Sequence, residues 1–403
     1  MKLGILREEK TPPDKRVPLT PAQCVEVQKK FRNVKMFVQS SRLRCFNDED
    51  YIKAGIQVQE DLSGCDVILG VKEVRAENLI PGKIYFFFSH TIKKQEYNRK
   101  LLQEILKKKV QLVDYEVITD TNGFRIIGFG RYAGLVGAYN GLRAFGLRSR
   151  LFNLPPANTC FNLDEMLKQL KSIKLPPIKI AVTGDGRVAN GIVEILEFME
   201  IQQLTPYSYL KIEKPENPVF VQLHPQNYVQ HKENKEFDLL HFFNHPERYK
   251  NAFLPFARTT DMLIAGAYWD PKAPVLFTAD EMKDQAFRIR VISDITCDIE
   301  GSIPSTKKAS SIDDPFYDYN PTTGQVEPPF SDENNITVQA VDNLPCELPR
   351  DASVDFGRNI IDKVFPALLG KDEDGIIQRA SITKNGQLTD RFLYLRDFVN
   401  EGK

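Results

Sequence analysis

The sequence predicts an α/β protein built from two Rossmann-like, doubly wound domains with an interdomain cleft. Three observations support this fold class. Short apolar runs alternate with helix-like segments along most of the chain, which is typical of parallel sheets with helical crossovers. The 403 residues suit two or three domains at about 150 residues each. Residues 184–189 read Gly-x-Gly-x-x-Ala, directly after an apolar run and before a helix-like segment.

The first third of the chain predicts alternating strands and helices. Apolar runs predict strands at residues 2–6, 34–38, 67–71, 84–88 and 110–114. The third and fourth runs are apolar on both faces, which indicates buried parallel strands. Thr20-Pro21 predicts a helix start, because threonine caps a helix and proline fits its first turn. We also expect a short helix at 50–55 and an amphipathic helix at 97–109.

The remaining chain predicts a second domain and a C-terminal return. We expect helices at 132–148 and 164–171, and strands at 178–183, 219–223, 262–268, 289–293 and 338–341. Residues 301–335 are rich in Pro, Ser, Asp and Asn and predict a long loop. The last 60 residues predict helices that return to the first domain. We therefore assign residues 1–129 plus 346–403 to a substrate-binding, catalytic domain and residues 130–345 to a dinucleotide-binding domain.

Composition argues against several classes of protein. Lys+Arg and Asp+Glu both number 54, so the formal charge is zero, without the basic excess of a nucleic-acid binder. No apolar run approaches the roughly 18 residues of a membrane helix, and the charged N-terminus does not resemble a signal peptide. The six cysteines lie far apart with no Cys-x-x-Cys pair, so we expect no metal site and a reducing, cytoplasmic location.

The glycine-rich turn predicts a nicotinamide dinucleotide site, NADP or NAD. Gly184 permits the tight turn, Gly186 lets the backbone approach a pyrophosphate, and Ala189 lets helix and strand pack closely. Backbone N–H groups at the helix start, at Arg187 and Val188, would face the phosphate charge. The alternative is a glycine-rich turn without a ligand.

The acidic residue that binds the ribose of NAD about 20 positions later has no counterpart. Residues 204–211 contain no carboxylate, and Ser208 and Lys211 could hold a 2′-phosphate, which favours NADP. The alternative is that the strand lies elsewhere and the acid with it, for example at Glu213.

Two titratable residues follow adjacent buried strands of the first domain. Lys72 follows one apolar run and His90 the next. Ligands of open parallel sheets bind beyond the carboxyl ends of the strands, so these residues are candidates for an acid–base pair. An apolar surrounding would lower the pKa of Lys72 and make it a base near neutral pH. The alternatives are a solvated lysine and a structural histidine.

Charged residues near the domain junction and the later strands complete the candidate site. Arg16, Arg125 and Arg131 could bind carboxylates, or could form structural salt bridges instead. Asp294 and Asp342 end strands of the second domain, and we assign both to the cofactor site.

Several motifs in fixed order resemble the alanine dehydrogenase and saccharopine dehydrogenase superfamily. They are Arg16-Val-Pro-Leu-Thr-Pro21, Gly70-Val-Lys72, Phe87-Phe-Ser-His90, Phe129-Gly-Arg-Tyr-Ala-Gly134, Asp294-Ile-Thr-Cys-Asp298 and Asp342-Asn-Leu-Pro345. The sequence is most similar to the lysine–ketoglutarate reductase domain of aminoadipate semialdehyde synthase and to lysine-forming saccharopine dehydrogenase. The resemblance extends from Leu3 to about Leu369.

This resemblance implies a reaction that joins the lysine side-chain amine to 2-oxoglutarate and reduces the imine to saccharopine, or the reverse. It implies that Lys72 exchanges a proton with the substrate amine and that His90 handles the water. It also implies that Arg16 and Arg125 face substrate carboxylates, and that Glu73 and Glu116 tune the charge of Lys72.

Two other functions fit the same residues. Alanine dehydrogenase, acting on pyruvate and ammonia, needs the same Arg, Lys and His residues. A nucleotide-binding regulator without catalysis is a third possibility. The sequence decides neither the direction of the reaction nor the oligomeric state, so a homo-oligomer stays open, and it assigns no role to residues 206–252.

Overall fold

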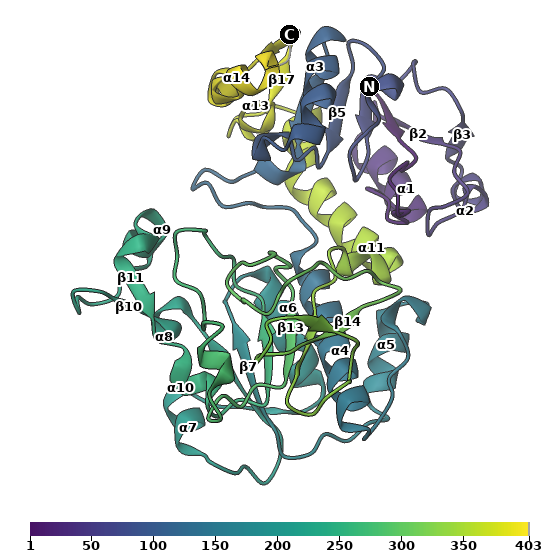
Figure 1. The fold of residues 1–403 in the computed structure, drawn as a ribbon. Coiled ribbons are helices and arrows are strands. Elements are labelled where there is room, and N and C mark those ends of the chain that lie inside the picture. Colours follow the sequence, from purple (N-terminus) through teal and green to yellow (C-terminus); the bar gives the residue numbers. More distant parts are fainter. Residues whose placement is uncertain (402–403) are drawn as a thin grey trace. The chain divides into compact units, whose positions relative to one another are not determined.

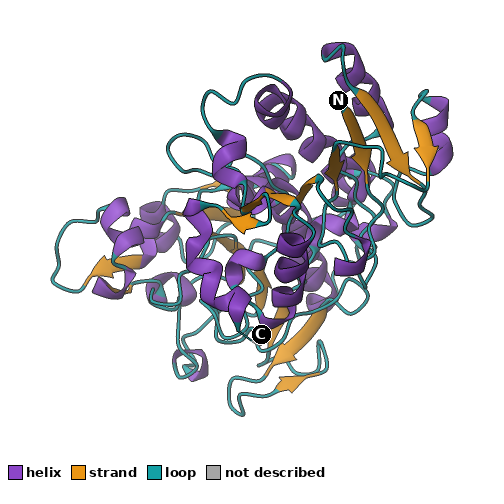
Figure 2. Cartoon of the chain, turned by 90° about the horizontal axis from the view of Figure 1, so that it is seen from above, coloured by secondary structure: helices purple, strands orange, loops and turns teal. Residues whose placement is uncertain are grey.

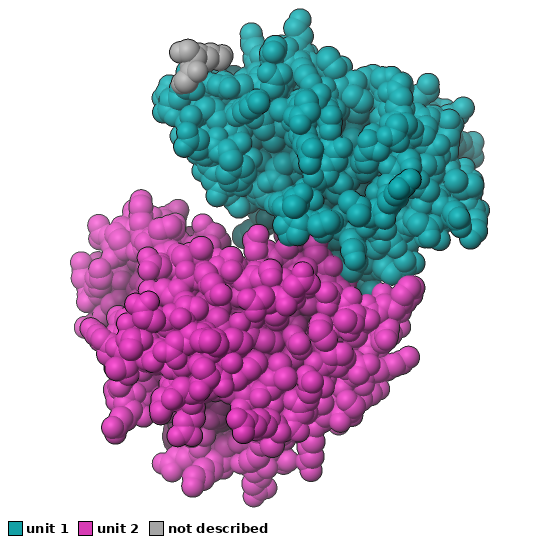
Figure 3. All heavy atoms as spheres, turned by 45° about the vertical axis from the view of Figure 1, so that its right-hand side comes forward, with its two compact units in different colours: residues 1–129, 349–403 teal, residues 130–348 magenta. Residues whose placement is uncertain are grey.

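The computed structural model describes residues 1–401, and the chain divides into two compact units (Figures 1 and 3). Unit 1 contains residues 1–129 and 349–403, and unit 2 contains residues 130–348. The second boundary falls at 348/349, where the sequence suggests 345/346. Each unit contains a largely parallel sheet with helices, so the predicted α/β class with Rossmann-like sheets is confirmed.

The sheet of unit 1 has six strands in the order β3-β2-β1-β4-β5-β6, all paired in parallel. The strands are β1 (Lys2–Ile5), β2 (Lys35–Gln39), β3 (Gln57–Gln59), β4 (Val67–Leu69), β5 (Ile84–Phe87) and β6 (Gln111–Asp114). β1 pairs with both β2 and β4, so the direction of winding reverses between β1 and β4. Ligands of doubly wound sheets bind at such a switch point, beyond the carboxyl ends of the strands.

The helices of unit 1 come from both ends of the chain (Figure 1). They are α1 (Pro21–Lys30), α2 (Asp48–Lys53), α3 (Arg99–Lys107), α11 (Pro349–Asn359), α12 (Phe365–Leu369), α13 (Ile376–Ala380) and α14 (Arg396–Asn400). A short antiparallel pair, β17 (Thr383–Lys384) and β18 (Gln387–Leu388), lies between α13 and α14 in sequence. The predicted start of α1 is confirmed, because Thr20 and Gln23 form a reciprocal capping box.

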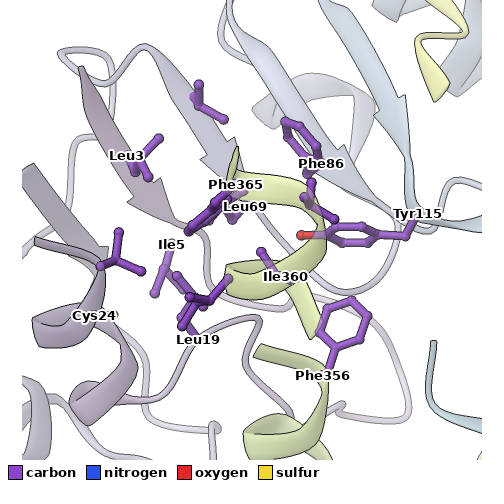
Figure 4. Close-up of a cluster of buried hydrophobic side chains, with 14 of the residues drawn as sticks. Leu3, Ile5, Leu19, Cys24, Leu69, Phe86, Tyr115, Phe356, Ile360 and Phe365 are labelled. Atoms are coloured by element: carbon purple, nitrogen blue, oxygen red, sulfur yellow. The ribbon is translucent and has the colours of Figure 1, made fainter. Parts of the chain in front are cut away.

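The C-terminal segment completes the hydrophobic core of unit 1. Leu3, Ile5 and Leu69 of the sheet lie in one buried cluster with Phe356 and Phe365 (Figure 4). These side chains are at most 1% exposed. The two sequence segments of unit 1 therefore share one core, as expected for a single folding unit.

Unit 2 contains an eight-stranded sheet in the order β15-β14-β16-β13-β12-β7-β9-β8. Figure 2 colours the strands of the chain orange and its helices purple. Its strands are β7 (Lys179–Thr183), β8 (Gln202–Gln203), β9 (Val219–Leu223), β12 (Met262–Ala265), β13 (Val291–Asp294), β14 (Phe316–Tyr319), β15 (Val326–Glu327) and β16 (Ile336–Gln339). Only β14 and β15 run antiparallel to their neighbours. The prediction of an uninterrupted loop at 301–335 is therefore wrong: β14 is fully buried and pairs with β16.

The described part of unit 2 also contains seven α-helices and a separate antiparallel pair of strands. They are α4 (Gly130–Ser149), α5 (Leu163–Leu170), α6 (Arg187–Phe198), α7 (Pro206–Lys211), α8 (Pro225–Tyr228), α9 (Leu239–Asn244), α10 (Leu254–Ala257), and the strands β10 (Val229–His231) and β11 (Tyr249–Asn251). α4 and α6 pack so closely that a Cβ on Gly134 would overlap the carbonyl oxygen of Val188. Across residues 1–401, no helix has the length and apolarity needed to span a bilayer.

Candidate functional site

Four neighbouring strands of unit 1 deliver polar side chains to one edge of the sheet. β1, β4, β5 and β6 are adjacent and parallel, so the residues that follow them lie at the same carboxyl edge. Glu8 follows β1, Lys72 follows β4, His90 follows β5, and Glu116 follows β6. The predicted adjacency of the strands before Lys72 and His90 is confirmed.

Lys72 lies in a partly buried position among charges of both signs. No hydrogen bond or ion pair involves its Nζ in the described part of the chain. Burial lowers the pKa of Lys72, and the positive charges of Arg16 and Lys10 lower it further, against the opposing effect of Asp14 and Glu73. A lysine with a depressed pKa has a neutral amine available at lower pH, so it can accept a proton.

His90 forms a hydrogen-bonded pair with Glu73. The distance from His90 Nδ1 to Glu73 Oε1 is 2.5 Å, and Lys10 Nζ lies 3.7 Å from Glu73 Oε2. Burial acts to raise the pKa of Glu73, but the hydrogen bond and charge of His90 outweigh it and bring the pKa to about 2. A carboxylate bonded to Nδ1 orients the imidazole and leaves Nε2 as the nitrogen available for chemistry.

Arg16 is held by a buried carboxylate and an aromatic ring. Its Nε and Nη2 donate to Asp14 Oδ1 and Oδ2 at 3.0 and 2.6 Å, and both residues are 2% exposed. The guanidinium carbon lies 4.0 Å from the centre of the Phe129 ring, which itself stacks on Phe356 at 4.3 Å. Burial acts against the charge of Asp14, but Arg16 holds the pKa of this carboxyl well below its usual range.

Arg125 and Glu116 extend this group of charges. The guanidinium carbon of Arg125 lies 5.2 Å from the centre of the Phe88 ring, and its Nε donates to Ile127 O at 3.0 Å. Glu116 pairs with Lys93 at 3.4 Å, and its Oε2 is buried without a hydrogen-bond partner among the described residues. Arg16, Lys72, Glu73, His90, Arg125 and Glu116, all chosen from sequence, therefore lie in one unit.

The glycine-rich turn of unit 2 has the geometry that a pyrophosphate requires. Gly184 has a φ of +101°, and a Cβ there would lie 3.0 Å from the backbone of Ala267. A Cβ on Gly186 would meet no atom within 4 Å, so space is open before the first turn of α6. The first N–H groups of a helix have no intrahelical partner, and those of Arg187, Val188 and Ala189 start α6. These residues fit the phosphates of a dinucleotide.

The structure corrects the placement of the segment after α6. Residues 206–211 form helix α7, and Lys179, the first residue of β7, donates from Nζ to Tyr209 O and Ile212 O at 2.6 and 2.5 Å. The end of α7 thus lies at the amino edge of the sheet, opposite the glycine turn. Ser208, Lys211 and Glu213 therefore belong to a segment that is directed away from a ribose at the carboxyl edge.

β9, not the 204–211 segment, is the strand next to β7 on this side. It ends at Leu223 and is followed by His224, whose Nδ1 lies 3.1 Å from Asp185 Oδ2. Gln222 Nε2 donates to Gly184 O at 3.0 Å. The position of the ribose-binding acid thus has no carboxylate of its own.

Three other predicted residues belong to unit 2, and two of them, Arg131 and Asp294, have partners within that unit. Arg131 forms a bidentate ion pair with Glu194 of α6, at 2.5 and 2.9 Å, and belongs to unit 2, whereas Arg16 and Arg125 belong to unit 1. Asp294 is fully buried and accepts hydrogen bonds from Thr296 and Thr306. Asp342 is exposed and follows the end of β16 by three residues.

Sequence reasoning missed Asp14, Lys10, Glu8 and Phe356 at this site. Asp14 stands two residues before Arg16, so two opposite charges close together in the sequence could have indicated this ion pair. Glu8 follows β1 as Lys72 follows β4, and the same strand-end rule would have selected it. Nothing in the local sequence of Phe356 indicates its contact with Phe129.

A family model and two solved structures indicate the class of protein to which this chain is similar. Residues 4–136 match the family model described as the alanine dehydrogenase/PNT, N-terminal domain. L-alanine dehydrogenase matches with a TM-score of 0.64 at 15% identity, over 99% of this chain and 100% of that one. Transhydrogenase from Sinorhizobium meliloti matches with a TM-score of 0.60 at 15% identity, over 96% and 100%. At this identity the two structures establish the fold alone.

Particular relatives are similar over nearly the whole chain. Alpha-aminoadipic semialdehyde synthase of Arabidopsis thaliana is 30% identical, over 98% of this chain and 41% of that protein. The mitochondrial enzyme of that name from Mus musculus is 28% identical, over 98% and 47%. Saccharopine dehydrogenase (NAD(+), L-lysine-forming) of Yarrowia lipolytica is 23% identical, over 90% of each.

These findings confirm the predicted resemblance to the alanine dehydrogenase and saccharopine dehydrogenase superfamily. The chain spans less than half the length of the two synthases. The fungal relative is named for NAD(+), in line with the predicted nicotinamide cofactor. The mouse synthase is named as mitochondrial, and a cytoplasmic location for this chain stays a prediction.

Proposed function

We propose that this chain is an NAD(P)-dependent oxidoreductase that interconverts saccharopine with lysine and 2-oxoglutarate. The observation that carries the proposal is the position of Lys72 at the switch-point edge, where Arg16, Asp14 and Glu73 act on its charge. The whole-length similarity to the synthases and to saccharopine dehydrogenase supports the choice of substrates.

Arg16 and Arg125 are proposed to bind the substrate carboxylates. Guanidinium groups match carboxylates in a bidentate fork, and both arginines lie against aromatic rings that limit their motion. Saccharopine carries three carboxylates, so a site rich in arginine suits it better than a site built for one carboxylate. Arg131, paired with Glu194, is left as a structural contact in this proposal.

Lys72 and His90 are proposed to divide the proton transfers. The lysine substrate must lose a proton before its amine attacks the carbonyl carbon of 2-oxoglutarate, and Lys72 accepts that proton. His90 serves the water that leaves in imine formation or attacks in the reverse direction, and Glu73 holds its ring in place. Glu73 and Glu116 are proposed to tune the charge of Lys72. Glu73 acts on that charge directly, and Glu116 forms an ion pair with Lys93.

Gly184, Gly186 and the first N–H groups of α6, at Arg187, Val188 and Ala189, are proposed to hold the pyrophosphate. When bound, the nicotinamide cofactor supplies the hydride that reduces the imine. Since no carboxylate follows β9 directly, we propose that either dinucleotide binds and that NADP is favoured. Asp294 and Asp342 are proposed to border the cofactor, Asp294 by fixing its loop through Thr296 and Thr306.

A spectrophotometric assay tests the proposal. The purified chain should oxidise NADPH or NADH with lysine plus 2-oxoglutarate, and much less with pyruvate plus ammonia. Preference for pyruvate and ammonia would favour alanine dehydrogenase, the second candidate, which the alanine dehydrogenase/PNT family model supports. Dinucleotide binding without turnover on either pair would favour a regulatory protein.

A further inference from the structure

A side chain bridges the point where β1 and β4 diverge. Backbone pairing of β1 with β4 ends at the bond from Leu6 N to Leu69 O. Beyond it, Glu8 Oε1 accepts from Val71 N at 2.6 Å, and Glu8 Oε2 accepts from Lys72 N at 2.8 Å. One carboxyl group thus accepts hydrogen bonds from two consecutive backbone N–H groups that no longer pair with β1.

We propose that Glu8 is a positioning residue for the Lys72 site, which clamps the backbone that carries Lys72 and, through its charge state, controls the attraction of Arg16 for substrate carboxylates. This inference rests on the proposed function. Glu8 does not touch the reacting atoms in this account. It acts through the backbone of residues 71 and 72 and through the nearby pair of Asp14 and Arg16.

Burial and the negative charge of Asp14 favour the neutral form of Glu8. Burial raises its pKa, and the negative charge of Asp14 raises it further, while the bonds from Val71 and Lys72 and the charge of Arg16 oppose this; the pKa is about 8. Glu8 also acts on Tyr115, whose pKa is raised by burial and by the charges of Glu8 and Asp114. At neutral pH, Asp14 is therefore ionised and Glu8 carries a proton.

This division of charge matters for substrate binding. With Glu8 neutral, Arg16 faces one buried carboxylate, and a substrate carboxylate adds the second negative charge. With Glu8 ionised, a second negative charge acts on Arg16 in addition to that of Asp14, and a substrate carboxylate must overcome the repulsion of both. We therefore expect binding of 2-oxoglutarate to weaken as the pH rises through 8.

The test compares Glu8→Gln with Glu9→Gln. Glutamine keeps the length and one acceptor oxygen but cannot ionise. Glu9 is the adjacent carboxylate, which bonds to Asn78 and approaches Arg7, away from Lys72. In wild type and Glu9→Gln, KM for 2-oxoglutarate should rise above pH 8, by up to about tenfold per pH unit. In Glu8→Gln this rise should be absent, and kcat should fall about tenfold at pH 7, since one of the two bonds is lost.

A second readout needs no turnover. In the folded wild type, Glu8 keeps its proton up to about pH 8. In the unfolded chain, Glu8 releases its proton above the ordinary glutamate pKa of 4.5. Wild type should therefore lose unfolding free energy relative to Glu8→Gln as the pH rises from 5 to 8, in urea titrations followed by circular dichroism. Glu9→Gln should keep the wild-type dependence.

The outcomes separate this inference from the proposed function. Absence of turnover in wild type would remove the proposed function, while the unfolding experiment still decides the state of Glu8. The inference is overturned if Glu8→Gln keeps the wild-type rise in KM, or if its stability follows pH as wild type does. It is also overturned if neither Glu8→Gln nor Glu8→Asp folds, because the role would then be purely structural.

Discussion

Asp14→Asn probes the buried pair that positions Arg16. Both side chains of the pair are at most 2% exposed and share two hydrogen bonds. Asparagine keeps the shape but removes the buried carboxylate charge that forms the ion pair with the Arg16 guanidinium. Breaking a buried ion pair in this way costs about 3–5 kcal/mol. In a unit of this size, 3 kcal/mol corresponds to a fall in Tm of about 6–12 °C.

Differential scanning calorimetry measures this change, and fluorescence separates the two units. The chain has one tryptophan, Trp269, and it lies in unit 2. We expect the calorimetric transition of unit 1 to move down and the Trp269 fluorescence transition to move less. Asp362→Asn is the matched control, because Asp362 and Lys30 form an exposed pair at 3.5 Å, worth at most about 1 kcal/mol.

The pH dependence of the Asp14→Asn effect has a defined sign. The pKa of Asp14 is depressed in the folded chain, so its contribution is present above an ordinary aspartate pKa of 3.8 and is lost as the pH falls below it. The difference between wild type and Asp14→Asn should thus be full at pH 7 and shrink below pH 4. Equal stability of the two proteins at pH 7, or a difference that grows in acid, would refute the reasoning.

Four further predictions concern the two sites. Lys72→Met should lose at least about 100-fold in kcat and retain dinucleotide binding by calorimetry; near-normal turnover would remove Lys72 from catalysis. Glu73→Gln removes a negative charge that opposes the lowered pKa of Lys72, so the acid limb of the pH–rate profile should move to lower pH by about one unit. Gly186→Val should block both dinucleotides without loss of thermal stability, because its Cβ meets no atom within 4 Å; unchanged binding would contradict the site. Gly134→Ala should destabilise unit 2 by more than about 2 kcal/mol in urea, since its Cβ overlaps Val188 O, and a smaller change would show that α4 and α6 can separate.

Strands and caps with strong local signals were predicted well from the sequence. The apolar runs gave β1, β4, β5 and β7 within two residues at either end, because buried parallel strands are continuously apolar. The start of α1 followed from Thr20-Pro21, a capping signal contained within two residues.

Elements whose stability comes from distant partners were missed. β14 lies among Pro, Ser and Asp residues, and its pairing with β16 fixes it as a strand. The usual spacing from the glycine turn places the ribose-binding acid in residues 204–211, whereas this chain inserts α7 before β9, the strand that pairs with β7. The contacts of Glu8 with the backbone of residues 71 and 72 span more than 60 residues, which no local pattern reveals.

The most direct test of the proposed function follows one deuterium atom. The purified chain is incubated with lysine, 2-oxoglutarate and NADPH or NADH that carries deuterium at the transferable position, and the products are analysed by mass spectrometry. Our account predicts saccharopine with one deuterium, on the carbon that came from the carbonyl of 2-oxoglutarate. Labelled alanine from a parallel incubation with pyruvate and ammonia, without labelled saccharopine from lysine and 2-oxoglutarate, would contradict it.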